Sequence, residues 1–114
     1  MKKYRYMEVL YVPNVLDDRA VVVGIILWRP GSGFVQARKR TDWSAVLALD
    51  PDADTEFLAA AVDHIEVQFR QADEVERERL ITRLSMNLTT SEIREVETGD
   101  PDETLQQLAI ADEL

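Results

Sequence analysis

The chain has no cysteine and only one histidine, His64, among its 114 residues. Without thiols it can form no disulfide, thiolate zinc site, iron–sulfur cluster or cysteine nucleophile. A single histidine in a helical context, with no Gly-Ser elbow nearby, also supplies neither a Ser-His-Asp triad nor a typical zinc site. The residues therefore predict no catalytic set, no metal and no cofactor, and they favour a non-enzyme.

Long apolar segments are also absent. The longest apolar run, residues 20–28, has nine residues, against the ~20 that a membrane-spanning helix needs. The basic start at Lys2 and Lys3 is followed by polar and charged residues rather than by the apolar stretch of a signal peptide. We therefore expect a cytoplasmic protein with no membrane contact.

The composition is otherwise that of a globular protein, with 46% hydrophobic and 31% charged residues. We expect a single domain over residues 1–114, β-rich to residue 50 and helix-rich beyond it. The net charge of −9 argues against sequence-independent nucleic-acid binding. It is unevenly divided. Residues 1–50 carry eight basic and five acidic groups, a balance of +3, and residues 51–114 carry five and seventeen, a balance of −12.

Strands are predicted in the first half. Residues 3–12 and 20–28 are rich in β-branched, aliphatic and aromatic side chains. Because β-branched residues occupy both faces of 20–28, this strand should be central or covered on both sides. The turn residues 30–33 predict an antiparallel return over 34–40 as an edge strand. Residues 43–49 fit either another strand or a short helix.

Helices are predicted in the second half. The first covers residues 54–71, and its apolar stripe is Leu58, Ala61, Val62, Ile65 and Phe69. The second begins at a capping box of Asp73 and Glu76, and its stripe is Leu80, Ile81, Leu84 and Leu88. The charged face of this second helix, which includes Arg77, should be solvated.

A late strand over residues 91–98 and a last helix starting at Asp100, Pro101 and Glu103 complete the pattern. The predicted fold is α+β. We expect a three- or four-stranded, mostly antiparallel sheet, with two or three helices packed on one face.

Alternating acids at Asp50, Asp52 and Asp54 resemble the start of a calcium loop. The glycine that such a loop requires after its third acid is absent, and the closing glutamate position is Ala61. Helix capping is therefore the better interpretation of these acids.

One basic cluster is a candidate binding site: Arg38, Lys39 and Arg40, with Trp43 nearby. Three interpretations stay open. The charges can protect an edge strand from aggregation, bind an acidic protein surface, or contact nucleic acid weakly through residues 38–43. A different hypothesis is a small-ligand or nucleotide-acting enzyme that uses dispersed acids with Arg19, Arg29 or His64.

The N-terminal pattern is similar to that of a known family. Tyr4-Arg5-Tyr6, Tyr11-Val12-Pro13-Asn14, the apolar residues 21–28 and the glycine turn before Phe34 resemble the bacterial family called domain of unknown function 3037. The family pattern reads approximately Arg-Tyr-Val-Pro-Asp, then Gly-Glu-x-Val-Asn-Val-Gly-Val-Val-Leu. A helical middle and a late Asp-Pro-Glu helix follow, matched here by residues 100–103.

The chain departs from the family pattern at three positions. Leu10 stands in place of an arginine, Arg19 in place of a glutamate and Val22 in place of an asparagine. If the family's shared function depends on these positions, this member has lost or changed it. The resemblance implies a small interaction or accessory protein with a HipA-like kinase or a toxin-type protein as its partner, and it implies no assigned activity.

Overall fold

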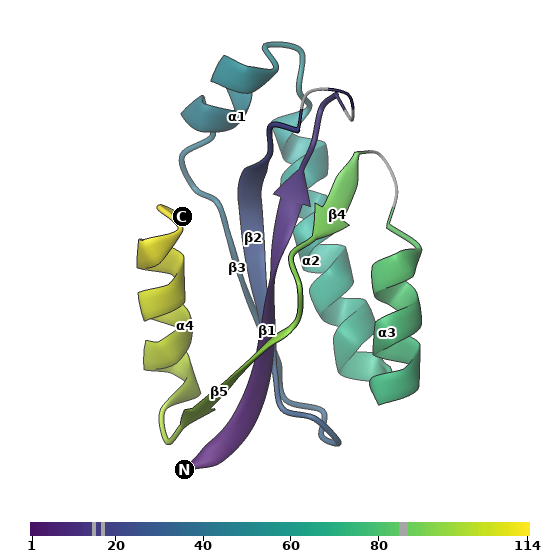
Figure 1. Cartoon of the computed structure of the whole chain (residues 1–114), viewed down its shortest axis with the longest axis vertical. Helices are drawn as coiled ribbons and strands as arrows, with labels where there is room; N and C mark the ends of the chain where they lie inside the picture. The colour runs from purple at the N-terminus through teal and green to yellow at the C-terminus, as the bar shows by residue number, and fades with distance from the viewer. Residues whose placement is uncertain (15, 17, 85–86) are drawn as a thin grey trace.

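The computed structural model describes residues 1–14, 16, 18–84 and 87–114 (Figure 1). The elements in chain order are β1 (Lys2–Tyr11), β2 (Val21–Trp28), β3 (Val35–Lys39), α1 (Ser44–Leu49), α2 (Thr55–Gln71), α3 (Glu74–Thr82), β4 (Leu88–Thr90), β5 (Arg94–Thr98) and α4 (Pro101–Ala111). The fold is α+β, as predicted, and the described residues form a five-stranded antiparallel sheet and four helices. The strands and the helices each outnumber the three or four strands and two or three helices that the sequence predicted.

The sheet has the order β3-β2-β1-β4, and β5 pairs with the same side of β1 as β4 does. The strand predicted to be central, β2, lies between β3 and β1, and β3 is an edge strand. Where one late strand was expected there are two short ones. They are separated at the point where the Glu8 amide donates to the Ser91 hydroxyl (2.8 Å) instead of to a strand carbonyl.

Helices cover both faces of the sheet, which corrects the prediction of one covered face (Figure 1). On one face, α2 packs Val62 and Phe69 against the sheet. On the other, α4 packs Leu105 against Ile25 and Leu27 of β2. Since the side chains of a strand alternate between faces, a central strand of aliphatic residues requires cover on both, and α4 supplies the second layer.

α2 lies very close to β2 at Gly24. A Cβ atom added at Gly24 would lie 2.8 Å from a methyl carbon of Val62. Only glycine leaves room for this approach. The same strand carries a β-bulge here, because Val9 pairs with Gly24 and Leu10 with Val22, which leaves one residue of β2 unpaired.

Local signals placed the helix starts correctly. The Asp54, Asp73 and Asp100 side chains each accept a hydrogen bond from the amide three residues later, as the capping patterns predict. The ambiguous segment 43–49 contains the helix α1. Leu88 does not extend the stripe of α3, because α3 ends at Thr82 and Leu88 begins β4.

Arg77 was predicted to be solvated, and this was wrong. Its side chain is 2% exposed. It donates to the carbonyl oxygens of Phe69 (2.9 Å) and Ser32 (2.8 Å) and to the carboxylate of Glu74 (2.6 Å). Because the buried charge has three acceptors, it can be accommodated in the interior. It joins the turn after β2 to the corner between α2 and α3.

Candidate protein-docking groove

The predicted basic cluster does not form one surface. Arg38 and Lys39 are neighbours on β3, so their side chains point to opposite faces of the sheet. Arg38 is exposed. The Lys39 ammonium lies 2.8 Å from the carboxylate of Asp63 on α2. Of these two, only Arg38 has no acidic partner among the described residues.

The other two members of the cluster support the fold. The Arg40 side chain is largely buried, and the residue is 8% exposed. Its guanidinium donates to the carbonyl oxygens of Val22 (2.8 Å) and Asp42 (3.1 Å). Trp43 is partly buried and packs against the core. Little of either side chain is left to offer a partner.

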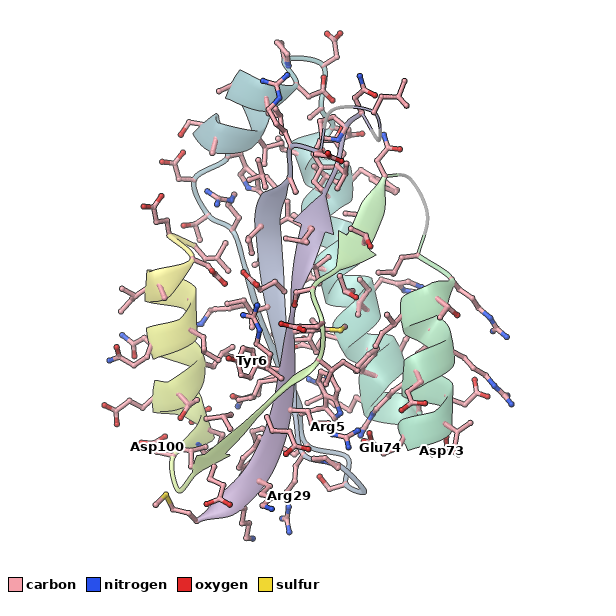
Figure 2. The ribbon with its side chains drawn as sticks, in the orientation of Figure 1. Arg5, Tyr6, Arg29, Asp73, Glu74 and Asp100 are labelled. Atoms are coloured by element: carbon pink, nitrogen blue, oxygen red, sulfur yellow. The ribbon has the colours of Figure 1, made fainter. Side chains whose placement is uncertain are left out.

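Arg19 and Arg29 lie at opposite ends of β2. Arg19 precedes the strand, and Arg29 follows it near the N-terminus of the chain (Figure 2). A strand of eight residues is about 27 Å long at 3.4 Å per residue. One small ligand cannot reach both side chains.

Arg19 lines a hollow of about 300 Å³ with Asp50 and three other residues. The Tyr11 hydroxyl donates to Asp50 at 2.6 Å. This hydrogen bond, together with burial and the negative charge of Asp50, raises the pKa of Tyr11 to about 12. The hydrogen bond to Asp50 therefore connects the C-terminal end of α1 to β1. In the described residues, no group of three or more acidic or histidine side chains could hold a metal ion.

A hollow with a volume of about 500 Å³ lies along α2. We call it the α2–α3 groove. Its wall on α2 consists of Phe57, Ala60, Ala61, His64, Ile65 and Gln68. Its other wall consists of Leu80, Arg83, Leu84 and Leu88.

The groove follows from the lengths of the two helices. α2 has 17 residues and α3 has 9, and α3 lies beside the C-terminal half of α2 (Figure 1). Among the elements that the structure describes, no helix lies beside the flank of the N-terminal half. Phe57 is consequently 42% exposed although it is a large aromatic side chain.

The electrostatics of the groove differ from those of the chain as a whole. None of its described lining residues is acidic, and two of them, Arg83 and His64, are basic. Both side chains are exposed, and neither has an ion pair or side-chain hydrogen bond within the described part of the chain. In a protein of net charge −9, this is an apolar groove with a basic rim.

Sequence reasoning identified only part of this groove. Leu80, Leu84 and Leu88 were assigned to one helix stripe and Ala61 and Ile65 to another, and His64 was noted as a lone histidine. The remaining signal was Phe57, an aromatic residue outside the predicted stripe of α2. Whether such a residue is covered depends on where the next helix ends, which a periodicity pattern does not give.

A second polar cluster lies on the face covered by α4. The Glu8 carboxyl, 16% exposed, meets Asp112 at the C-terminal end of α4. Burial, followed by the hydrogen bond and repulsion from Asp112, raises the pKa of Glu8, while Arg94 at 3.6 Å acts in the opposite direction. A hydrogen bond with the Tyr6 side chain raises the pKa of the Arg94 guanidinium.

These features define a small α+β protein with helices on both faces of an antiparallel sheet and an apolar groove beside its longest helix. The model of the family described as "Protein of unknown function (DUF3037)" matches residues 6–111. The chain therefore belongs to the DUF3037 family, as the N-terminal pattern indicated. No curated protein and no solved structure matches it. None of the described helices is long and apolar enough to cross a membrane.

Proposed function

We propose that this protein is an interaction module that binds a partner protein in the α2–α3 groove. The observation that carries the proposal is the groove itself, with Phe57 42% exposed beside exposed Ala60. Contiguous apolar surface is costly in water and marks sites of protein interaction. A partner that covers Phe57 and the opposing leucines, Leu80, Leu84 and Leu88, removes that surface from water.

The alternative functions have less support. An enzyme that uses Arg19, Arg29 and His64 would need these side chains to converge. Arg19 and Arg29 flank the two ends of β2, and His64 belongs to the groove on α2. A nucleic-acid site at residues 38–43 would rest mainly on Arg38, since Arg40 is buried and Lys39 is paired.

The resemblance to the family implies a class of partner protein. A HipA-like kinase or a toxin-type protein in the bacterial cytoplasm is the partner to test first. The departures at Leu10, Arg19 and Val22 are remote from the α2–α3 groove in the sequence and do not line it. Docking in the groove is therefore independent of the positions where this member differs from its family.

The proposal is tested by filling the groove. Ala60→Trp places a large side chain on its α2 wall, at an exposed helix position. Val67→Trp is the matched control, because Val67 is also exposed on α2 but does not line the groove. Each tagged full-length chain is co-expressed with a HipA-like kinase and cross-linked in cells. The tagged chain is then captured by its tag, and the proteins retained with it are quantified by mass spectrometry.

We expect a protein that cross-links to Phe57 or its neighbours to be retained by wild type and by Val67→Trp, and lost with Ala60→Trp. Retention that is equal in all three chains would place docking elsewhere. Absence of any partner whose capture depends on Ala60 would also contradict the proposal. Circular dichroism melts of the three chains verify that the substitutions leave the fold intact.

A further inference from the structure

The α2–α3 groove has the dimensions of a helix-binding site. Its lining residues on α2 run from Phe57 to Gln68, an axial distance of about 16 Å at 1.5 Å per residue. A helix that docks in a groove uses anchors at i, i+3 or i+4, and i+7, which span about 10 Å. The groove therefore accommodates the full set of anchors of one partner helix.

Exposure along the groove argues for a helix rather than a small molecule. Phe57, Ala60, His64 and Arg83 line it and are all exposed to solvent. Small-molecule sites enclose most of their ligand. A site that is open to solvent at these residues covers one face of its ligand, which is what an amphipathic helix requires.

Charge defines the polar side of that helix. The Arg83 guanidinium stands at the C-terminal end of α3, and His64 faces the same groove from α2. Asp63, the acid next to His64 in the sequence, is held by Lys39 at 2.8 Å. A cationic residue on the partner would be repelled by Arg83, because no carboxylate among the described lining residues offsets this repulsion.

We propose that the occupant of the α2–α3 groove is an amphipathic helix of a partner protein, with an acidic residue beside its apolar face that pairs with Arg83. This inference rests on the proposed function and specifies its partner. Affinity comes from burying Phe57 and the opposing leucines, and the ion pair at the rim selects the partner by its charge.

A selection from a helical-peptide library tests the inference. The probe is a phage-displayed library of peptides of about 16 residues, with apolar anchors at i, i+4 and i+7 and with Glu, Gln or Lys allowed at all flanking positions. The full-length protein is the bait. Enriched peptides are resynthesised with Glu, Gln or Lys at the selected flanking position, and their Kd values are measured by fluorescence anisotropy.

Glutamate should be enriched at one flanking position, and its replacement by lysine should weaken binding about tenfold. Arg83→Glu should reverse this preference. Arg79→Glu should preserve it, because Arg79 is exposed on the same helix but pairs with Glu76 and does not line the groove. Amide shifts of the ¹⁵N-labelled protein should map to α2 and α3.

Several results would overturn the inference. No enrichment, enrichment of lysine, or a glutamate preference that survives Arg83→Glu would each exclude the acidic helix. Self-association of the wild type that displaces the peptides would assign the groove to a second copy. Stabilisation by apolar carboxylates, with no peptide enriched, would assign it to a small ligand.

Ala60→Trp separates this inference from the proposed function. If Ala60→Trp abolishes peptide binding but no charge preference exists, the groove is the docking site and the partner chemistry is wrong. If selected peptides bind Ala60→Trp as well as wild type, the groove is not the docking site and both proposals fail. If partner capture in cells depends on Ala60 but no peptide is selected from the library, the groove is still the docking site. Only the proposal that its occupant is an amphipathic helix is then contradicted.

Discussion

The buried guanidinium of Arg77 donates a hydrogen bond to the carbonyl oxygen of Ser32, 45 residues earlier in the chain, at 2.8 Å. The same side chain holds Glu74 at 2.6 Å, and Glu74 lies 3.4 Å from Arg5 of β1 (Figure 2). The Trp28 indole also donates to Glu74, at 3.5 Å. A charged network therefore connects β1, the end of β2, the turn beyond it and the start of α3.

Replacing Arg77 should be strongly destabilising. Arg77→Met fills a similar space but removes the charged donor from the Glu74 carboxylate and from the carbonyl oxygens of Phe69 and Ser32. Because Glu74 is 28% exposed and keeps Arg5 nearby, we expect a loss of about 3 kcal/mol in the free energy of unfolding. Arg79→Met, on the exposed side of α3, should cost less than about 1 kcal/mol. Urea unfolding followed by circular dichroism measures both, and similar losses would contradict the buried network.

Arg77 also shows what the sequence could and could not predict. The caps at Asp54, Asp73 and Asp100 were predictable because each involves an amide three residues away. The burial of Arg77 was not, because its charged neighbours on α3 resemble a solvated face. Contacts with the distant turn at Ser32 and with the Phe69 carbonyl oxygen of α2 distinguish Arg77 from Arg79.

The same limit applies to the layers and to the groove. The continuous aliphatic run of β2 predicted a strand that is central or covered on both faces, yet nothing local showed that α4 covers the second face. The α2–α3 groove exists because α3 ends before it reaches the flank that carries Phe57. The lengths of elements far apart in the chain combine to make such a site, and hydrophobic periodicity records only one element at a time.

Gly24 should not tolerate even a methyl group. In Gly24→Ala the new Cβ would lie 2.8 Å from Val62 on α2 and 3.2 Å from the Arg38 carbonyl oxygen, so we expect a loss of about 1–3 kcal/mol. Gly33→Ala is the control, because no atom lies within 4 Å of a Cβ there. If Val62 is the obstacle, adding Val62→Ala should recover part of the loss, with a coupling energy of about 1 kcal/mol in a double-mutant cycle. Purely additive losses would show that the backbone contact dominates.

The outer edge of β3 is closed by side chains of α2. The Ala37 amide donates to the Glu66 carboxylate at 2.6 Å, and Arg70 donates to the Val35 carbonyl oxygen at 3.1 Å. Exposed strand edges pair readily with other chains. Glu66→Ala frees the Ala37 amide, so we expect concentration-dependent self-association in sedimentation velocity runs and a loss of about 1–2 kcal/mol in stability.

Asp63→Ala is the matched control for this edge. It removes the partner of Lys39 on the same helix but leaves the hydrogen bond between Glu66 and Ala37 in place. The control should stay as monomeric as wild type. Self-association that is equal in both variants would attribute the effect to lost negative charge instead of to the opened edge.

The carboxyl pair of Glu8 and Asp112 should make stability depend on pH. Burial and Asp112 raise the pKa of Glu8 above its ordinary value of 4.5, against the opposing charge of Arg94. A carboxyl whose pKa is higher in the folded state contributes stability that is fully present below its unfolded pKa. That contribution is lost as the pH rises through the folded pKa.

Glu8→Gln tests this dependence because it keeps a neutral side chain with an N–H donor beside Asp112. We expect the variant to be more stable than wild type at about pH 7 and to lose that advantage at about pH 4, below the ordinary pKa of 4.5. Glu113→Gln, an exposed neighbour of Asp112, removes one negative charge without touching the pair and should show no such crossover. Urea midpoints at both pH values measure the difference. If the stability advantage of Glu8→Gln is the same at the acidic pH, protonation of Glu8 beside Asp112 does not cause it.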